Sequence, residues 1–351
     1  MKLISIHQFY TFGHHHTNTN TMNKVRWGIL STAKIGRIQV IPAMQKSQYA
    51  EIVAIASRDE ERAQTTAAEL YIPKVYGDYK SLLADPDIDA IYNPLPNHLH
   101  VPYTIKALQA GKHVLCEKPI GMNAEEAQQL LNATKQYPHL KVMEAFMYRF
   151  HPQWIKAKQV VDEGLLGDVK AIHAHFSYFN DDANNIRNKP EVGGGALMDI
   201  GCYCISFPRY ITGNEPQRVV SLIDLDPQMK TDRLTSGMLD FGQGITTTFT
   251  CSTQLEPYQR VNIFGTKGRL EIEIPVNAIA DEPAKLWLQN NRMIQEITTD
   301  PVNQYTLQAD EFSKAILNNT DVPTPLTAAV NNMKVIDALF KSAQDKAWIN
   351  L

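Results

Sequence analysis

The sequence predicts an α/β protein with two parts: an N-terminal doubly wound parallel sheet, and a C-terminal α+β domain whose sheet is open-faced and mostly antiparallel. Two observations predict this fold. In the first half, short apolar strand patterns alternate with helical stretches of ten or more residues, which is typical of βαβ units. In the second half, strand patterns follow one another across short turns, which is typical of antiparallel sheets. The length of 351 residues allows roughly two domains.

The first half contains five strand patterns. They cover residues 25–30, 51–57, 89–94, 112–117 and 141–145, and the helical stretches between them cover 34–47, 59–70, 98–110 and 123–136. Strands that alternate with helices in this way form a parallel sheet with helices on both faces. We therefore expect residues 24–150 to fold as one doubly wound domain.

The second half begins with a helix that runs through residue 161. Strand patterns follow at 169–179, 218–225, 233–241, 244–253, 259–265 and 268–274, with an apolar helical stretch near 195–211 between the first two. Residues 326–347 again have helical spacing of apolar side chains. We expect residues 151–325 to form the second domain, and the C-terminal helix within 326–351 to pack back on the domains.

Residues 1–23 differ from the rest of the chain. Three histidines, 14–16, are followed by alternating Thr and Asn without apolar periodicity, so we expect a disordered tail or tag. The histidines could bind a metal, but adjacent histidines on such a segment are not a preorganised site, and we expect no metal centre.

Composition and charge exclude several classes of protein. The net charge of −3 offers no broad attraction for nucleic acid or an anionic membrane. We find no signal peptide and no apolar run long enough to span a bilayer. Four cysteines without a CxxC pair suggest reduced thiols. We expect a cytoplasmic protein that binds a small molecule.

The first strand leads into a turn that takes the place of a G-x-G-x-x-G motif before a helix. Two of the three glycines are replaced, by Ser31 and Ala33, but both residues are small enough for close approach of the backbone. The helix that follows presents its N–H groups to a diphosphate. The candidate contacts in this turn are Ser31, Thr32, Ala33, Ile35 and Gly36; the alternative is an ordinary strand-to-helix turn.

The second strand ends at Ser57 and Arg58, about 20 residues after Gly36, where a dinucleotide fold meets the adenosine ribose. An acidic residue here would accept from the 2′-hydroxyl, whereas an arginine accommodates a 2′-phosphate. Arg58 therefore favours NADP, with NAD possible. The alternative is a solvated arginine before a helix.

Two further motifs lie at the ends of apolar strands, where open parallel sheets bind ligands. The first includes Asn93, Pro94, Asn97 and His98, and the second is Glu117-Lys118-Pro119. A lysine directly after a buried strand suggests a functional role, although a surface lysine with a buried stem is the alternative.

Asp199 and Tyr203 open the apolar helical stretch after three consecutive glycines, and their spacing puts them on one helix face. A phenol with a pKa near 10 is a poor base, but a nearby ammonium favours the phenolate. Lys118 could supply that ammonium if a cleft between the domains brings the two side chains together. The alternative for Tyr203 is a core tyrosine.

These segments together resemble the glucose-fructose oxidoreductase / inositol dehydrogenase (Gfo/Idh/MocA) family from about Lys24 to Leu351. The resemblance rests on WGILSTAKIGR, VAIASRDEERA, IYNPLPNHLHVPYTIKALQAGKHVLCEKP, EAFMYRFHPQW and GGGALMDIGCYCI. It implies a Rossmann domain, an open-faced sheet domain and nicotinamide bound in the cleft beside Lys118. Many members have histidine where this chain has Tyr203, so the chain is most similar to the branch of trans-dihydrodiol dehydrogenase and NADP-dependent D-xylose dehydrogenase.

The resemblance implies an NADP-dependent oxidoreductase that acts on a sugar, polyol or cyclic dihydrodiol. Tyr203 would be the acid/base, Lys118 would lower its pKa, and Asp199 would orient the substrate or Lys118. Arg149, His173 and His175 are further candidates for the substrate pocket, with structural histidines as the alternative. Two other functions remain open: a nicotinamide-dependent glycosidase, and a cofactor-binding regulator without turnover.

In a strand, odd and even positions point to opposite faces of the sheet. The strand patterns of the second half have apolar or β-branched residues at both kinds of position, so neither sheet face is simply polar. Helices of the same chain can cover one face. We expect the other face to form a homodimer or a dimer of dimers, as the resemblance also implies; the alternative is a solvated, Thr-rich face.

Overall fold

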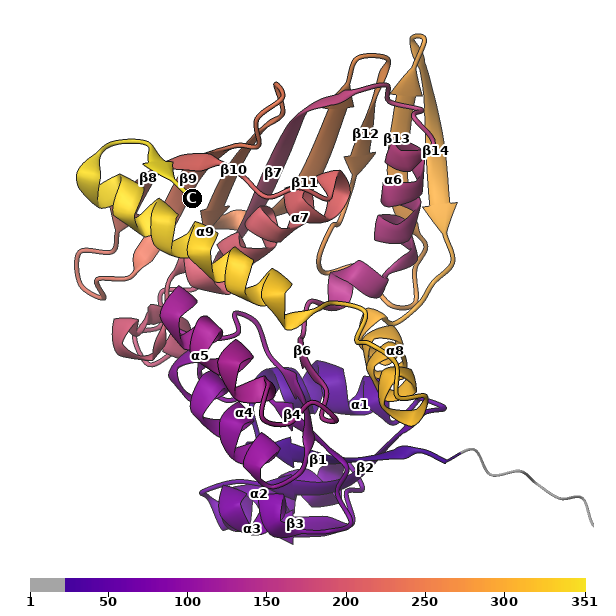
Figure 1. Ribbon diagram of the computed structural model, residues 1–351, viewed down its shortest axis with the longest axis vertical. Helices are drawn as coiled ribbons and strands as arrows, with labels where there is room; N and C mark the ends of the chain where they lie inside the picture. Colours follow the sequence, from indigo (N-terminus) through magenta and orange to yellow (C-terminus); the bar gives the residue numbers. More distant parts are fainter. Residues whose placement is uncertain (1–22) are drawn as a thin grey trace, which may run out of the picture.

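The computed structural model describes residues 23–351 and has two halves, one built on each of two sheets (Figure 1). The three consecutive histidines and the expected tail up to residue 22 lie outside the described residues. In residues 23–351, no helix combines the length and the apolar composition needed to cross a membrane.

The N-terminal sheet has six parallel strands in the order β3-β2-β1-β4-β5-β6. The strands are β1 (Val25–Leu30), β2 (Ala50–Ala56), β3 (Lys74–Tyr76), β4 (Ala90–Asn93), β5 (His113–Cys116) and β6 (Val142–Glu144). The doubly wound parallel sheet predicted from the sequence is confirmed. Since the strand order reverses between β1 and β4, the carboxyl ends of these two strands flank the crevice in which such sheets bind ligands.

Helices cover both faces of this sheet. They are a π-helical segment (Gly36–Val40) that continues into α1 (Ile41–Met44), then α2 (Glu60–Glu69), α3 (Tyr79–Ala84), α4 (His100–Gln109) and α5 (Ala124–Thr134). Side-chain caps explain where three of them begin: the carboxylates of Asp59 and Asp78 and the side-chain oxygen of Asn123 each accept a backbone N–H of the following turn.

The C-terminal sheet has nine strands in the order β14-β13-β12-β11-β7-β10-β9-β8-β15, and every neighbouring pair is antiparallel except β7 with β10. The strands are β7 (Val169–Phe179), β8 (Arg218–Leu225), β9 (Asp232–Asp240), β10 (Thr246–Ser252), β11 (Gln254–Gly265), β12 (Gly268–Ile272), β13 (Ala284–Asn290), β14 (Met293–Thr299) and β15 (Ile349–Asn350). The mostly antiparallel sheet is confirmed.

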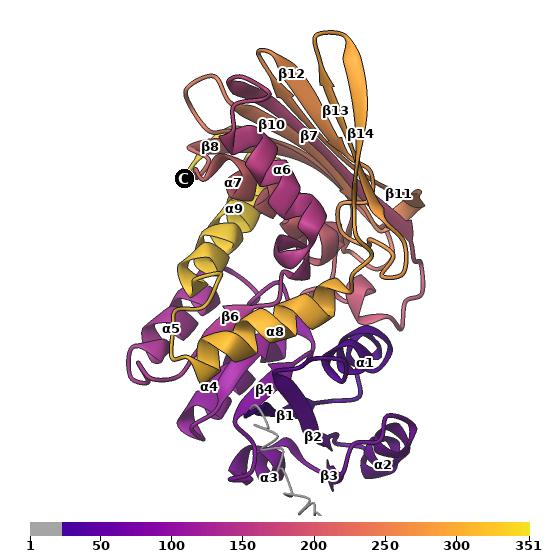
Figure 2. The same cartoon turned by 90° about the vertical axis from the view of Figure 1, so that its right-hand side faces the viewer.

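Three helices lie on one face of this sheet and leave the other face open (Figure 2). They are α6 (Pro152–Asp162), α7 (Cys202–Thr212), which continues a π-helical segment (Leu197–Gly201), and α9 (Leu326–Asp345). Helix α9 packs against β8 and α7 of the C-terminal half and against α5 of the N-terminal half. It therefore packs back on both halves.

Helix α8 (Gln304–Leu317) differs from the expected division, which placed residues up to 325 with the second domain. It packs on the N-terminal sheet: the rings of Trp27 and Phe312 lie 5.7 Å apart, and the Trp27 indole donates to Ser313 Oγ at 3.3 Å. The chain therefore returns to the first half before it enters α9.

The hairpin of β13 and β14 has no counterpart among the predicted strands. Its turn contains Asn291 and Arg292, both with positive φ (46° and 65°). Two consecutive left-handed residues form the tight turn that matches the twist of paired strands.

Candidate active site

The turn after β1 keeps its shape without the usual first glycine. Ser31 has φ +69°, a left-handed conformation that costs a residue with a Cβ roughly 1–2 kcal/mol. Its hydroxyl accepts the N–H of Ala33 at 3.2 Å, and its own N–H donates to Ala56 O at 2.8 Å. These bonds hold the turn in place at the start of the helix, whose first N–H groups have no intrahelical partner.

Gly36 lies where the helix after the turn packs on the neighbouring strand β4. A Cβ at this position would lie 3.6 Å from the buried Tyr92 ring and 3.8 Å from Pro94, which are ordinary van der Waals distances. In that loop, His98 Nδ1 is buried and has no hydrogen-bond partner among residues 23–351. The free N–H groups at the start of the helix and the unpaired His98 nitrogen fit a dinucleotide with its diphosphate at the turn.

Arg58 lies exposed at the end of β2, next to Tyr79: burial raises the pKa of the Tyr79 hydroxyl, and the Arg58 guanidinium opposes that rise. The nearest acidic side chain, Asp59, caps α2 by accepting the N–H of Arg62 at 3.0 Å, and Ser57 Oγ accepts the N–H of Asp59. One carboxylate oxygen of Asp59 is thus occupied as a helix cap, and Arg58 is the cationic side chain at this strand end.

The loop after β4 holds two asparagines with different roles. Asn93 is fully buried and donates to His100 O at 3.1 Å and Thr104 Oγ1 at 3.2 Å, so its amide holds the loop together. Asn97 donates to Gly193 O at 2.8 Å and links the loop to the glycine-rich segment of the other half. Glu117, at the end of β5, accepts the hydroxyl of Tyr92 at 2.7 Å.

Lys118 and Asp199 meet between the two halves. The Lys118 ammonium donates to the Asp199 carbonyl at 2.7 Å and to Asp199 Oδ1 at 3.1 Å, and both side chains are nearly buried. Burial by itself would raise the pKa of Asp199, but Arg187 and Lys118 hold it well below its usual range. Burial alone would lower the pKa of Lys118, but attraction to the Asp199 carboxylate and to neighbouring acidic groups has the larger net effect, so the pKa of Lys118 is raised above its usual value. The pair is therefore charged at neutral pH.

Two further side chains contact the other oxygen of Asp199. Arg187 Nε donates to Asp199 Oδ2 at 2.9 Å, and the Tyr178 hydroxyl donates to the same oxygen at 2.6 Å. Sequence reasoning missed both residues. Strand alternation could have located Tyr178, since it shares its parity on β7 with the buried residues Ala174 and Phe176; Arg187, in a loop, had no such signal.

Tyr203 lies one turn after Asp199, with its ring in an aromatic cluster. Its hydroxyl donates to Met147 Sδ at 3.4 Å, its ring meets that of Phe146 edge-on at 5.1 Å, and the Lys118 ammonium lies 5.2 Å from the ring centre. Burial raises the pKa of Tyr203 well above its usual value. The structure does not support the expectation that Lys118 lowers the pKa of Tyr203. The ammonium lies over the ring of Tyr203, and its two hydrogen bonds are to Asp199.

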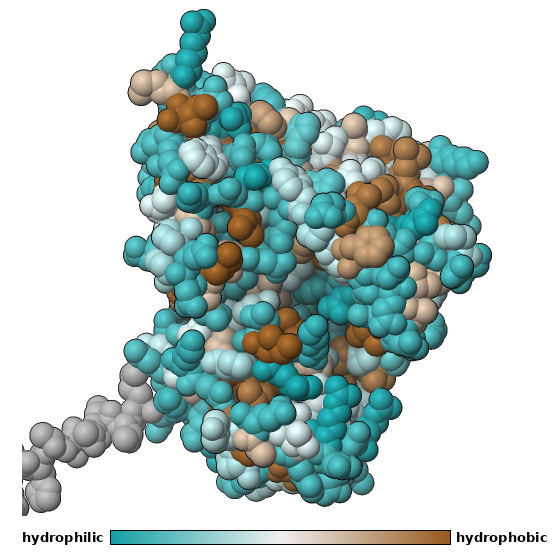
Figure 3. Space-filling model, turned by 180° about the vertical axis from the view of Figure 1, so that it is seen from behind, coloured by the Kyte–Doolittle hydropathy of each residue, from teal (hydrophilic) through white to brown (hydrophobic). Residues whose placement is uncertain are grey.

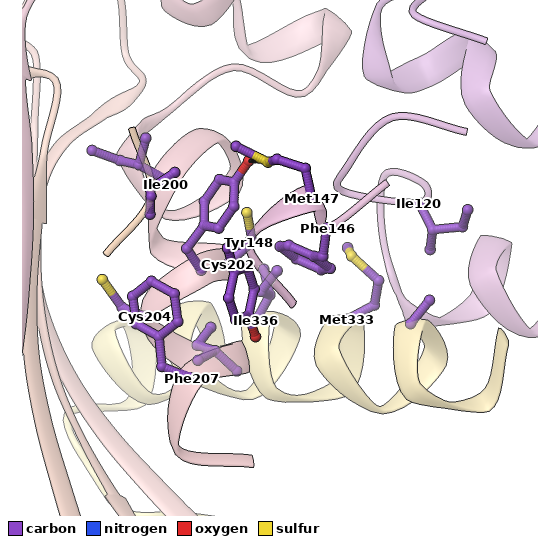
Figure 4. Packing of buried hydrophobic residues seen from close by; sticks show 14 of the residues in the cluster. Ile120, Phe146, Met147, Tyr148, Ile200, Cys202, Cys204, Phe207, Met333 and Ile336 are labelled. Carbon is purple, nitrogen blue, oxygen red and sulfur yellow. Dashed lines mark hydrogen bonds between the residues drawn. The ribbon is translucent and has the colours of Figure 1, made fainter. Parts of the chain in front are cut away.

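Tyr203 belongs to a buried cluster to which both halves of the chain contribute, and Figure 4 shows part of it. Phe146, Met147 and Tyr148 follow β6, Cys202 and Phe207 belong to α7, and Met333 and Ile336 belong to α9; all are buried. The packing holds α7 against both halves of the chain, so the helix that carries Tyr203 has little freedom to shift.

Asp232, at the start of β9, fixes the entry into the helical segment. Its carboxylate accepts the N–H of Leu197 at 2.6 Å and the hydroxyl of Thr235 at 3.0 Å. Gly195 has φ +117°, and a Cβ there would overlap the Asp232 carboxylate. The third glycine of the run is therefore required both by its backbone conformation and by this close contact. Sequence reasoning missed Asp232, since nothing in its strand pattern marks it as buried.

Three predicted pocket residues do not join this cluster. Arg149 donates to Ser206 Oγ at 3.1 Å and stacks over Tyr210, both further along α7. His173 and His175 line a broad depression on the open face of the C-terminal sheet, opposite to Phe176, whose ring contacts Tyr203. The alternation along β7 put the two histidines on one face, as expected, but that face is turned away from Lys118.

The arrangement can hold a dinucleotide at the carboxyl edge of the N-terminal sheet and can move a proton at the phenol beside a charged Lys–Asp pair. In residues 23–351, no group of three or more His, Cys, Asp and Glu side chains is placed to bind a metal ion. The Tyr203 phenol and the Lys118–Asp199 pair support acid–base chemistry.

Both halves of the chain match described families. Residues 25–146 match the oxidoreductase family with an NAD-binding Rossmann fold, and residues 154–271 match the GFO/IDH/MocA C-terminal domain.

Curated relatives cover most of the chain. An uncharacterized oxidoreductase of Rhizobium meliloti is 41% identical over 332 residues, which are 93% of this chain and 99% of the relative. D-xylose 1-dehydrogenase (NADP(+)) 2 of Haloferax volcanii is 37% identical over 326 residues, 93% and 99% of the two chains. A trans-1,2-dihydrobenzene-1,2-diol dehydrogenase of Xenopus tropicalis is 34% identical over 252 residues, 70% and 74%.

Among solved structures, the chain is similar to KijD10, a 3-ketoreductase from Actinomadura kijaniata in complex with NADP and TDP-benzene. The TM-score is 0.86 at 26% sequence identity, and the match covers 91% of this chain and 98% of that one.

Proposed function

Because the chain belongs to the Gfo/Idh/MocA oxidoreductase family, we propose that it is an NADP-dependent dehydrogenase that transfers a hydride between nicotinamide and a carbinol carbon of a sugar, polyol or cyclic dihydrodiol. The observation that carries this proposal is the Lys118–Asp199 pair, charged and nearly buried, next to Tyr203 at the carboxyl edge of the parallel sheet. The relatives named D-xylose dehydrogenase and dihydrodiol dehydrogenase support this class of substrate.

The cofactor would lie along the carboxyl edge of the N-terminal sheet. The residues that would hold it are Ser31, Thr32, Ala33, Ile35 and Gly36 at the diphosphate, Ser57 and Arg58 at the adenosine ribose, and Asn93, Pro94, Asn97, His98, Glu117 and Lys118 towards the nicotinamide. When bound, the nicotinamide supplies the hydride chemistry. Arg58, with Asp59 occupied as a helix cap, supports NADP over NAD.

Tyr203 would exchange a proton with the reacting oxygen. Because its pKa is raised by burial, the phenol is protonated at neutral pH and suits the reduction of a carbonyl, in which it donates its proton. Oxidation of the alcohol needs the phenolate and would be favoured by high pH. The substrate hydroxyl would then replace Met147 as the partner of the phenol.

Lys118 would place a positive charge at the reacting oxygen. An ammonium has three N–H donors, and two of those of Lys118 go to Asp199, so one remains for the substrate. Asp199 would orient Lys118, and Arg187 and Tyr178 hold Asp199 from its other side. The site would thus present one directed donor and one acid/base to a single oxygen atom.

The open face of the C-terminal sheet supports a homodimer. Helices cover only its other face, and the open face carries a depression of about 680 Å³ and the exposed side chains of Leu222 and Met238. Seen from that side, apolar residues gather among polar ones over the upper half of the molecule (Figure 3). A second copy placed about a two-fold axis would cover this face.

A spectrophotometric screen of aldoses, polyols and dihydrodiols tests the reaction through the absorbance of NADPH. We expect oxidation of at least one of these alcohols with NADP, at a rate that rises with pH. Release of a free sugar from a glycoside without net NADPH formation would contradict a dehydrogenase and favour a glycosidase. Binding of NADP without turnover of any alcohol would favour a regulator.

A further inference from the structure

His100 connects the two loops that carry the candidate site on the N-terminal sheet. It is the first residue of α4 and is 1% exposed. Its ring nitrogens lie between two backbone carbonyls: Nδ1 is 2.7 Å from Pro119 O, and Nε2 is 2.6 Å from Leu95 O. Leu95 belongs to the loop after β4, and Pro119 directly follows Lys118. We propose that His100 is a positioning residue that sets the place of Lys118 by tying these two loops together.

The backbone next to Lys118 is held on two sides. His100 contacts the carbonyl of Pro119, and Glu144 accepts the N–H of Ile120 at 2.8 Å. Glu144 belongs to β6, so its bond ties this segment to the neighbouring strand. The backbone N–H of Glu117 donates to Asn93 O at 3.0 Å and ties the residue before Lys118 to the loop after β4. His100 adds a side-chain link on the other side of Lys118, and its own carbonyl accepts the Asn93 amide at 3.1 Å.

The position of this segment decides where the ammonium lies. From the backbone beside Pro119, the Lys118 side chain reaches across to the other half of the chain and donates to Asp199 at 2.7 and 3.1 Å. A shift of this backbone segment would force the Lys118 side chain to change its rotamer in order to keep the hydrogen bonds to Asp199. Small displacements of this kind change turnover because the reacting groups must be aligned.

Histidine suits this position because its two nitrogens face opposite ways. Burial lowers the pKa of His100 to about 4, although both carbonyls act in the other direction. The neutral ring carries one N–H and donates to one carbonyl, and its unprotonated nitrogen then faces the other carbonyl oxygen without a proton between them; only the doubly protonated ring donates to both. A glutamine amide can replace one such donor, whereas alanine removes the ring and leaves both carbonyls without a partner.

His113 provides a matched control. It is half-buried at the amino end of β5, the strand that leads to Lys118, and burial lowers its pKa to about 4 as well. Its Nδ1 accepts the N–H of Lys141 at 2.9 Å, at the edge of the sheet opposite to the site. His113→Ala therefore removes a comparable ring and hydrogen bond without touching either loop.

The first test reads the place of Lys118 without any substrate. In protein with ¹⁵N-labelled lysine side chains, the Lys118 signal is identified by its loss in Lys118→Met, and its titration midpoint is measured in each variant. Because contact with Asp199 raises the pKa of Lys118, we expect a lower midpoint in His100→Ala, a smaller change in His100→Gln and none in His113→Ala. An unchanged midpoint in His100→Ala would overturn the proposal.

The second test is a double-mutant cycle with D-xylose and NADP, and it rests on the proposed function. We expect His100→Ala to lower kcat about tenfold or more, with NADP affinity within about threefold, and to add less than about twofold in a Lys118→Met background. Additive losses, or an equal loss in His113→Ala, would mean a merely structural role. If Lys118→Met itself turns over normally, the proposed function fails, while a shifted Lys118 midpoint in His100→Ala still supports the positioning role.

Discussion

The ammonium of Lys118 lies 3.1 Å from a carboxylate oxygen of Asp199 and 2.7 Å from the carbonyl of the same residue. The two hydrogen bonds join the end of β5 to the helical segment before Tyr203, so each half of the chain contributes one partner. Since the side chains are only 13% and 14% exposed, water screens the attraction little. This contact holds the Lys118 ammonium against the helical segment of the other half.

Lys118→Met should lower turnover by about a hundred- to ten-thousandfold, the range typical of a group that acts on the reacting oxygen. It should leave NADP affinity nearly intact, because Asp199 keeps Arg187 and Tyr178 as partners and the segment keeps its fold. Steady-state kinetics and titration of NADP by tryptophan fluorescence measure both effects. A large loss of NADP affinity at near-normal kcat would contradict the assignment of Lys118 to the chemical step.

Tyr203→Phe should likewise remove most turnover and should also abolish the rise of the oxidation rate with pH. The sign follows from the raised pKa of Tyr203: below that pKa the phenolate fraction grows about tenfold per pH unit, and oxidation grows with it. The double variant with Lys118→Met should be scarcely worse than either single variant, since the two groups act on one oxygen.

Tyr148→Phe is the matched control for this experiment. Tyr148 lies in the same aromatic cluster, with its ring 6.0 Å from that of Tyr203, and its hydroxyl is hydrogen-bonded to Ser206 Oγ at 2.6 Å. We expect it to cost about 1 kcal/mol of stability and to leave the pH profile unchanged. If Tyr203→Phe retains near-normal activity, the acid/base must be another group, with His98 the nearest candidate on the cofactor side.

Arg58→Ala should reduce the preference for NADP over NAD by about ten- to a hundredfold, because a charge-assisted contact to a 2′-phosphate is worth roughly 1.5–3 kcal/mol. The ratio of kcat/KM for the two cofactors measures this preference. Arg62→Ala, in the first turn of the helix that follows Arg58 and with its side chain in solvent, serves as the control. Equal kcat/KM for both cofactors in the wild type would show that Arg58 does not select the phosphate.

The parts of the fold that follow from local pattern were predictable. The ranges 25–30, 169–179 and 218–225 coincide with β1, β7 and β8, because continuous or alternating apolar residues bounded by turns have one sensible reading as strands. β3 and α3 are only three and six residues long, too short for a period to show. Helix α8 was missed because its partners, Trp27 and the N-terminal sheet, are far away in the sequence.

The candidate site was predictable only in its outline. Strand ends and the spacing of Asp199 and Tyr203 located the residues that line the crevice. The direction of each side chain depends on tertiary contacts. The Tyr203 hydroxyl donates to Met147, which belongs to another segment. Asp232, 29 residues after Tyr203, accepts the N–H of Leu197 where the helical segment begins. The histidines of β7 show the same limit, since alternation puts them together but does not say which face is covered.

Asp232→Asn should change how stability depends on pH. Burial raises the pKa of Asp232 to about 7, even though Leu197 and Thr235 donate to its carboxylate. Between about pH 4, near the pKa of an unfolded aspartate, and pH 7, the folded protein therefore binds one proton more than the unfolded chain. The contribution of this group to stability is fully present below about pH 4 and is lost as the pH rises towards 7.

Asparagine does not titrate, so the Asp232→Asn variant should lose this dependence. The free energy of unfolding should fall with pH less steeply than in the wild type, by up to about 1.4 kcal/mol per pH unit within that window. Urea unfolding at pH 5, 6 and 7 measures the slope. Asp78→Asn is the control: hydrogen bonds from Ser81 lower the pKa of that exposed carboxyl, so it titrates below this window and its loss should leave the slope between pH 5 and 7 unchanged. Parallel slopes for wild type and Asp232→Asn would mean that Asp232 is ionised throughout.

The open face of the C-terminal sheet should form the dimer contact. On this face Leu222 is 78% exposed and Met238 is 38% exposed, and between them and β11 lie His173, His175, Ser236, Thr248 and Thr250. Arg260, paired with Glu271 at 3.0 Å, also lines the depression, and the rest of the lining is apolar or uncharged polar, as is typical of the buried part of an interface, where charged residues are depleted. A solvated face would instead carry the Lys and Glu residues that keep β-sheets from pairing with other chains.

Light scattering at micromolar concentration should therefore give a mass of about twice the 39.6 kDa of one chain. Leu222→Glu should shift the protein towards the monomer, because burying an unpaired carboxylate in the contact costs several kcal/mol. Tyr71→Glu is the control: Tyr71 is 90% exposed in the N-terminal half, and a charge there should leave the mass unchanged. A wild-type mass near 39.6 kDa that does not change on concentration would mean that the polar side chains of this face are sufficient to keep it in water, and that the apolar residues among them mark no interface.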